Sequence, residues 1–128
     1  MLKMPSTVKL TAAFALGRLA FGVGLMARPE RIASGWVGED AERDAVKIVL
    51  RGLGARDVAL SAGALVALGD EDRLAHWVAA AIGCDLCDVV STLAAPPHAL
   101  PGNARWGTLA LGGGSALAGA LLLAAIKR

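Results

Sequence analysis

The chain has 128 residues, of which 55% are hydrophobic and 16 are glycine, and it contains no tyrosine. A water-soluble chain of this length keeps more of its surface polar, so the composition argues against an ordinary soluble domain and predicts a multi-pass membrane protein. The 13 basic residues nearly balance the 11 acidic ones, which excludes a basic face for nucleic acid. We therefore expect the lipid bilayer, and no nucleic acid, as a partner.

The first apolar run, residues 10–27, is long enough to cross a bilayer and ends at the Arg-Pro pair 28–29. Lys3 and Lys9 precede this run, as basic residues do in a signal peptide. However, Arg18 interrupts the apolar core, and no clean small-x-small cleavage site follows. We therefore expect the run to be retained as a membrane span.

A polar connection and a second apolar run follow. The connection, residues 28–44, carries five acidic and three basic residues. We expect it to lie at the membrane interface, with Trp36 at the depth of the headgroups. The second run, residues 48–68, ends at Gly69 and at the acidic turn 70–72.

Two further apolar runs complete the chain. The third, residues 74–95, is stopped by the proline pair 96–97, and the fourth, residues 106–126, has no charged residue. The pattern predicts an all-α fold. Residues 1–128 would form a single domain, a four-helix transmembrane bundle that runs up-down-up-down.

Four spans place both termini on the same side of the membrane, and the distribution of basic residues favours the cytoplasmic side. On that side lie Lys3, Lys9, Arg73, Lys127 and Arg128. On the opposite side lie Arg28, Arg31, Arg43 and Arg105.

Charged residues inside the apolar runs need partners, because each costs about 2.5 to 3.5 kcal/mol at the centre of a span. Three arginines are matched by three aspartates: Arg18, Arg51, Arg56, Asp57, Asp85 and Asp88. Counted from the membrane face that the three helices share, all except Arg51 lie at a similar depth, about 10 to 15 Å. Arg51 is shallower and can extend toward the headgroups. We predict that Arg56 contacts Asp88 or Asp85.

This charged layer has more than one interpretation. Intramembrane ionisable residues often mark a functional site, and Asp85 and Asp88, three residues apart on a helix, are the candidate catalytic acid and base. They would act on a lipophilic small molecule by isomerisation, ring closure or epoxide opening. The candidate substrate-binding residues are Arg18, Arg51, Arg56 and Asp57. Alternatively, the layer is a set of buried ion pairs that fixes helix packing in a structural or accessory subunit.

Two weaker alternatives remain open. One is a proton pathway, although a single layer does not make a continuous relay. The other is a membrane thiol or quinone redox protein, because Cys84 and Cys87 form a C-x-x-C motif on one helical face. Buried cysteines also serve as small packing residues. His76, near the start of the third run, is expected to be an interfacial histidine. His98 lies in the proline-rich loop without a visible co-ligand, so we expect no metal site, and the sequence identifies no cofactor.

Small residues recur along the predicted helices and favour close helix packing in lipid. In the fourth run they recur every four residues, at Thr108, Gly112, Ala116, Ala120 and Ala124. This stripe is also a candidate surface for a homo-oligomer. Close packing is expected in the first two runs at Gly17, Gly22, Gly24, Gly52 and Gly54.

Two motifs and the helix after them carry a resemblance. They are RLAFGVGLMARPE (18–30), RGLGARDVALSAG (51–63) and a polar third helix. Together they resemble the DoxX-like superfamily of small four-helix membrane proteins over nearly the whole chain, with Gly-Ala-Arg-Asp (54–57) as the most distinctive part. Some members of such families are associated with quinone-linked oxidation. The resemblance implies a fold and assigns no catalytic residue.

Overall fold

The computed structural model describes residues 5–128, so Lys3 lies outside the described residues. The helices are α1 (Pro5–Ala27), α2 (Pro29–Val37), the 3-10 helix η1 (Gly38–Glu42), α3 (Asp44–Val66), α4 (Glu71–Ala94) and α5 (Ala104–Ile126). No strand occurs in these residues. The predicted all-α class is confirmed.

The helix boundaries follow local chemistry. Pro29 begins α2, a position where its missing N–H costs nothing. The carboxylate of Asp70 caps α4 by accepting a hydrogen bond from the Arg73 backbone N–H at 3.0 Å. α3 ends at Val66, before the predicted end at Leu68, because the following residues form the turn to α4.

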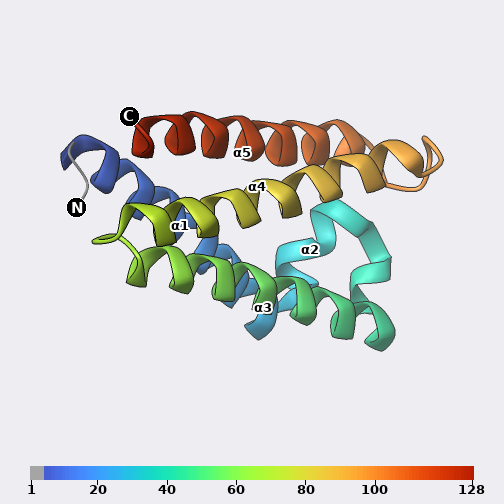
Figure 1. Ribbon diagram of the computed structural model, residues 1–128. Helices are drawn as coiled ribbons and strands as arrows, with labels where there is room; N and C mark the ends of the chain where they lie inside the picture. The colour runs from blue at the N-terminus through green and yellow to red at the C-terminus, as the bar shows by residue number, and fades with distance from the viewer. Residues whose placement is uncertain (1–4) are drawn as a thin grey trace.

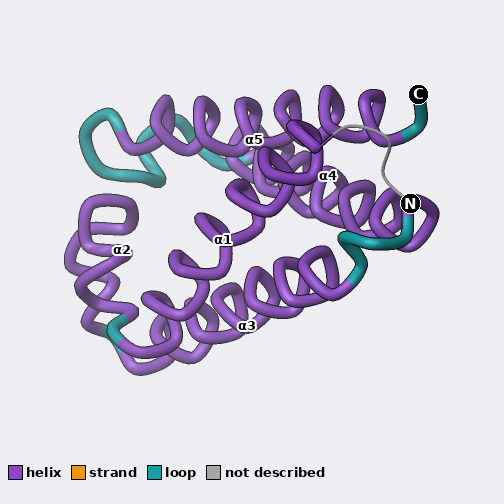
Figure 2. Tube along the Cα trace, turned by 90° about the vertical axis from the view of Figure 1, so that its left-hand side faces the viewer, coloured by secondary structure: helices purple, strands orange, loops and turns teal. Residues whose placement is uncertain are grey.

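The four long helices associate as two pairs (Figure 1). α1 packs along α3, and α4 packs along α5, whereas contacts between the pairs are fewer. Among the described residues, no Cα atom of α1 comes within 8 Å of a Cα atom of α4. The C-terminus and the α3–α4 turn lie at the same end as the start of α1, and α2 lies at the opposite end beside the α4–α5 loop (Figures 1 and 2).

Two glycines allow α1 and α3 to touch. A Cβ atom added to Gly54 would lie 2.5 Å from the carbonyl oxygen of Gly22, and one added to Gly22 would lie 2.7 Å from that of Gly54. Neither backbone leaves room for a side chain, so close packing at this pair is confirmed. Gly17 and Gly52, in contrast, have no such neighbour within 4 Å.

Small residues on α5 face α4. A Cβ atom on Gly112 would lie 3.1 Å from Val89, and one on Gly119 would lie 2.8 Å from Ile82. The predicted stripe follows this face only in part, because Ala120 and Ala124 are exposed. A four-residue repeat drifts by about 40° per step around a helix of 3.6 residues per turn.

The apolar core is divided into two clusters. One lies toward the α3–α4 turn and contains Ala15, Ala64, Ala67, Leu74, Ala75, Val78 and Ile126. The other lies where α2 packs and contains Leu25, Ala33, Ala41 and Leu50. The segment 28–44, expected as an interfacial connection, is thus mostly helical and part of this second cluster. The charged residues at the middle of α1 and α3 fall between the two clusters.

The outer surface is suited to lipid. Ser6–Ala27, Glu71–Ala94 and Ala104–Ile126 are long and apolar enough to cross a membrane. Large apolar side chains are exposed on the long helices, among them Leu10 (62%), Ile48 (71%), Val66 (77%) and Leu111 (75%). Exposed apolar surface of this extent is typical of a membrane protein. α3 is not among the three candidate spans, since it carries five charged residues.

Candidate functional site

Five of the six predicted intramembrane charges meet in one connected set, here called the charge network. Arg18 donates from Nη1 to Asp57 Oδ1 at 3.2 Å and from Nη2 to Asp85 Oδ2 at 2.6 Å. Arg56 binds both oxygens of Asp88 at 3.1 and 3.0 Å, and its Nη2 also lies 3.4 Å from Asp57 Oδ1. The order is therefore Asp85, Arg18, Asp57, Arg56, Asp88. The predicted contact between Arg56 and Asp88 is confirmed.

The charge network has a closed end and an open end. The side chains of Arg18, Asp57 and Asp85 are only 10%, 5% and 7% exposed. Those of Arg56 and Asp88 are 28% and 37% exposed. A molecule that approaches from outside the protein therefore meets Asp88 and Arg56 first.

The charges within the charge network do not balance. Two guanidinium groups against three carboxylates give 2 − 3 = −1 when all five are ionised. An uncompensated charge away from water is costly, so a proton or a cationic group is the natural complement. The buried Nε of Arg56 has no hydrogen-bond partner in the described part of the protein and is one further donor.

Arg51 does not join the charge network. Its Nε donates to the carbonyl oxygen of Met26 at 3.2 Å, at the end of α1, and the side chain is exposed. The expected match of three arginines with three aspartates is therefore wrong at this position. Arg56 lies five positions after Arg51, so the two side chains point in directions about 140° apart around α3.

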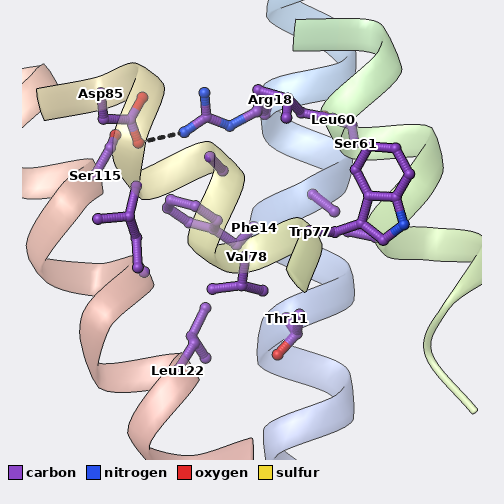
Figure 3. Close-up of a pocket in the computed structure, with 15 residues that line it drawn as sticks. Thr11, Phe14, Arg18, Leu60, Ser61, Trp77, Val78, Asp85, Ser115 and Leu122 are labelled. Carbon is purple, nitrogen blue, oxygen red and sulfur yellow. Dashed lines mark hydrogen bonds and ion pairs between the residues drawn. The ribbon is translucent and has the colours of Figure 1, made fainter. Parts of the chain in front are cut away.

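A narrow crevice adjoins the closed end, between α1, α3, α4 and α5 (Figure 3). Arg18 and Asp85 lie at one end of it, and Thr11 and Leu122 lie at the other. Most of the lining is apolar or aromatic. Its volume, measured for the centre of a water molecule, is about 20 Å³, which is room for a group the size of one or two waters.

Three side chains that sequence analysis did not single out shape this crevice: Phe14, Ser61 and Trp77. The Phe14 ring lies 5.7 Å from the Arg18 guanidinium carbon, a cation–π distance. The Ser61 hydroxyl is buried and has no partner in the described residues. The helical spacing held a signal, because Phe14 is four residues before Arg18, and Ser61 is four residues after Asp57.

Trp77 covers Gly63, where a Cβ atom would overlap the indole ring. This contact joins α4 to α3 beside the crevice. No spacing rule within one helix indicates it, because the two residues belong to different helices. It had to be found in the structure.

The histidines and Cys87 lie apart from these contacts, whereas Cys84 lies near Arg56. Cys84 is half-buried and Cys87 is exposed, and both are free thiols. The Nδ1 of His76 lies 2.6 Å from the carbonyl oxygen of Asp72. His98 is in the α4–α5 loop. Within residues 5–128, no group of three or more His, Cys, Asp or Glu side chains is placed to hold a metal ion.

Comparisons with protein-family models, with curated proteins and with solved structures found no match to this chain. The DoxX-like resemblance therefore stays a prediction from the sequence. The function has to be argued from the charge network and the crevice.

Proposed function

We propose that α3 crosses the membrane together with α1, α4 and α5, which gives a four-span, up-down-up-down transmembrane bundle. The close contact between Gly22 and Gly54 supports this, because a membrane that encloses α1 would also enclose the helix packed along it. The central charges of α3, on Arg56 and Asp57, are directed to the charge network and not to lipid. The pairing offsets part of their insertion cost.

The four-span proposal has a direct test in the location of the termini. We expect both on the cytoplasmic side. Single cysteines placed at each end of a Cys84→Ala/Cys87→Ala variant would be labelled with a membrane-impermeant maleimide in intact cells and in inverted vesicles. Labelling of the two termini from opposite sides would contradict four spans.

We propose further that the charge network binds a lipophilic small molecule and acts on it by acid/base chemistry. The observation that carries this proposal is the open end, where the carboxylate of Asp88 is 37% exposed on a surface otherwise suited to lipid. A molecule dissolved in the bilayer would reach Asp88 and Arg56 without crossing water.

The excess of one carboxylate supplies the acid/base step. Two ionised carboxylates match two guanidinium groups, and a proton on the third neutralises the charge network. One acid and one base then coexist, with Asp85 and Asp88 in these roles on one face of α4. Arg18, Arg56 and Asp57 position them, and the Arg56 Nε can hold an oxygen of the substrate. Isomerisation, and ring closure by a nucleophile within the substrate, need only such proton transfers, whereas epoxide opening also needs a water molecule that the base deprotonates as it attacks the ring carbon.

The test of binding is native mass spectrometry of the protein extracted gently from membranes. We expect a retained small molecule in the wild type and its loss in Asp88→Asn. A matched control is Arg43→Gln, an exposed residue of the connection between η1 and α3 whose ion pair with Asp40 is also exposed. A wild-type protein that retains no molecule, or an Asp88→Asn variant that retains it equally, would refute the proposal.

A second candidate is a structural or accessory subunit whose charge network sets helix packing. The observation that favours it is the closed end, where Arg18 links α1 to Asp85 of α4 although these helices make no close backbone contact. In this case the ion pairs hold the two helix pairs together. The stability of the protein, and no catalytic activity, would then depend on these ion pairs. Substitution of Asp85 and Asp88 by asparagine distinguishes this structural role from catalysis.

A further inference from the structure

We infer that the ligand of the charge network is a lipophilic monovalent cation, an amine in its ammonium form with an apolar tail, and that its binding displaces one proton. This inference rests on the proposed binding of a lipophilic molecule at the charge network and not on the acid/base step, because the bound cation takes the place of the proton that this step uses. It adds the charge and head group of that molecule. One cation enters, one proton leaves to water, and no covalent bond of the ligand changes.

The charge network is negatively charged when all five of its side chains are ionised. Its excess carboxylate favours a cationic group over a neutral or an anionic one. The guanidinium groups offer little to an anion, because both Nη atoms of Arg18 and both of Arg56 already bind carboxylates, and the Nε of Arg56 is a single donor without a partner among the described residues. Acceptor oxygens remain, since Asp57 and Asp85 each use one oxygen in these contacts.

The crevice beside the closed end also suits an ammonium group. Ser61 is 1% exposed and lines the crevice. Its hydroxyl has no hydrogen-bond partner in the described residues, so an N–H group of the ligand would satisfy it by donating a hydrogen bond. The rings of Phe14 and Trp77 line the same space and favour a cation or an apolar tail. A room of about 20 Å³ admits a primary ammonium group without moving a side chain.

The displaced proton has to come from an ionisable group at the charge network or at the crevice. α1 contributes Arg18, and α3 contributes Arg56 and Asp57. α4 contributes Asp85, Asp88 and the Cys84 thiol, which lies near Arg56. α5 contributes the neutral Ser115 to the crevice, and its one ionisable residue, Arg105, binds backbone carbonyls near the end of α4. The carboxylates are therefore the source of the proton.

Exchange of one proton for one cation has a quantitative consequence. At pH values at which the free protein holds the proton, each unit of increase in pH raises the apparent affinity for the cation about tenfold, because proton release and cation binding are linked. The affinity stops rising at a pH where the free charge network has already lost its proton. A neutral ligand that leaves the proton in place shows no such dependence.

The experiment compares three probes with the same tail in lipid nanodiscs: octylammonium, octanol and octanoate. Isothermal titration calorimetry, corrected with empty nanodiscs, gives the affinity of each probe. Repeating the titration in buffers of different ionisation enthalpy gives the number of protons released. We expect octylammonium to bind at least tenfold more tightly than the other two, with release of about one proton.

The variants sharpen this result. Asp88→Asn, at the half-exposed open end, removes the excess charge and should abolish both the preference for octylammonium and the proton release. Arg43→Gln should change neither. Because the wild-type protein alone reports proton release, the inference can be refuted even if a variant fails to fold.

The outcomes separate this inference from the function on which it rests. Octanol or octanoate binding as tightly as octylammonium, or octylammonium binding without proton release, would overturn the inference and leave the proposed lipophile site standing. Binding of none of the three probes above the empty-nanodisc background would contradict both.

Discussion

The two helix pairs differ in how they use small and charged residues. In the α1/α3 pair, Gly22 and Gly54 bring the backbones into contact, and the same two helices supply both arginines of the charge network. In the α4/α5 pair, Gly112 and Gly119 receive side chains of α4, and α5 adds no charge to the charge network. The carboxylates of α4 bind the arginines of the other pair.

This difference indicates that small residues and charged residues have separate structural roles. Small residues hold each pair together, where backbones can approach and van der Waals contact is the main attraction in lipid. Charges join one pair to the other, where α1 and α4 remain farther apart and long side chains bridge the gap. A chemical site between the pairs can then change its protonation or ligand without disturbing the packing inside either pair.

The largest expected effect comes from removing the cation shared by both pairs. Arg18→Met would leave Asp85 buried without a guanidinium and Asp57 with only its contact to Arg56 at 3.4 Å, and loss of one partner of a buried pair costs about 3 to 5 kcal/mol. The measurement is the free energy of unfolding in mixed micelles by titration with a denaturing detergent. Arg51→Met is the matched control, because that side chain is exposed and contacts only a backbone carbonyl among the described residues. Equal stability of the two variants would show that the buried ion pairs of Arg18 do not hold the two helix pairs together.

The next effect tests the contact within the α1/α3 pair. Gly54→Ala places a methyl group 2.5 Å from the Gly22 carbonyl oxygen, which cannot turn aside as a side chain would. We expect a loss of about 3 kcal/mol in the same titration, at the upper end for overpacking. Gly52→Ala, on the same helix with open space around it, should be neutral or should gain up to about 1 kcal/mol. A tolerated Gly54→Ala would mean that the two helices are not in backbone contact.

The third effect separates the two ends of the charge network. An asparagine keeps the shape and one acceptor oxygen of the aspartate but loses its charge. Asp85→Asn, at the closed end, should cost about 2 kcal/mol of stability. Asp88→Asn, at the open end, should cost less than about 1 kcal/mol.

The loss of function should not follow the loss of stability. Once a retained molecule is identified, Asp88→Asn should lower its turnover by about 10²- to 10⁴-fold in a folded protein. Cys84→Ser and Cys87→Ala serve as controls and should retain activity. Loss of activity in the cysteine variants, with both aspartates intact, would favour the thiol redox alternative.

The sequence alone was informative about depth. Positions counted from the ends of the apolar runs placed Arg18, Arg56, Asp57, Asp85 and Asp88 in one layer, and the structure brings those five together. Counting works because the rise per residue of a helix is constant, so distance along the chain becomes distance along the helix axis. The same count correctly placed Arg51 outside the layer.

The sequence was less informative about direction around each helix. It did not show that Arg51 points to the end of α1, or that Trp77 covers Gly63, because those contacts depend on how one helix is rotated against another. The sequence also did not reveal helix α2, because the connection 28–44 has no long series of apolar residues at helical spacing. The small-residue stripe on α5 was extended too far for a related reason, because its repeat turns away from α4 after Ala116.

The smallest effect on stability is expected at the exposed half of that stripe, and it bears on whether copies of the chain associate. Ala120→Leu should change the free energy of unfolding by less than about 0.5 kcal/mol, because Ala120 is exposed and contacts neither pair's interior. Ala116→Leu is its counterpart, since Ala116 is buried, and it should destabilise the fold by about 1 to 3 kcal/mol.

If the stripe mediates a homo-oligomer, Ala120→Leu should instead reduce energy transfer between fluorescently labelled copies in liposomes, because close helix contact needs small residues. Unchanged energy transfer would remove the stripe as an oligomer surface and leave the exposed face of α5 to lipid alone.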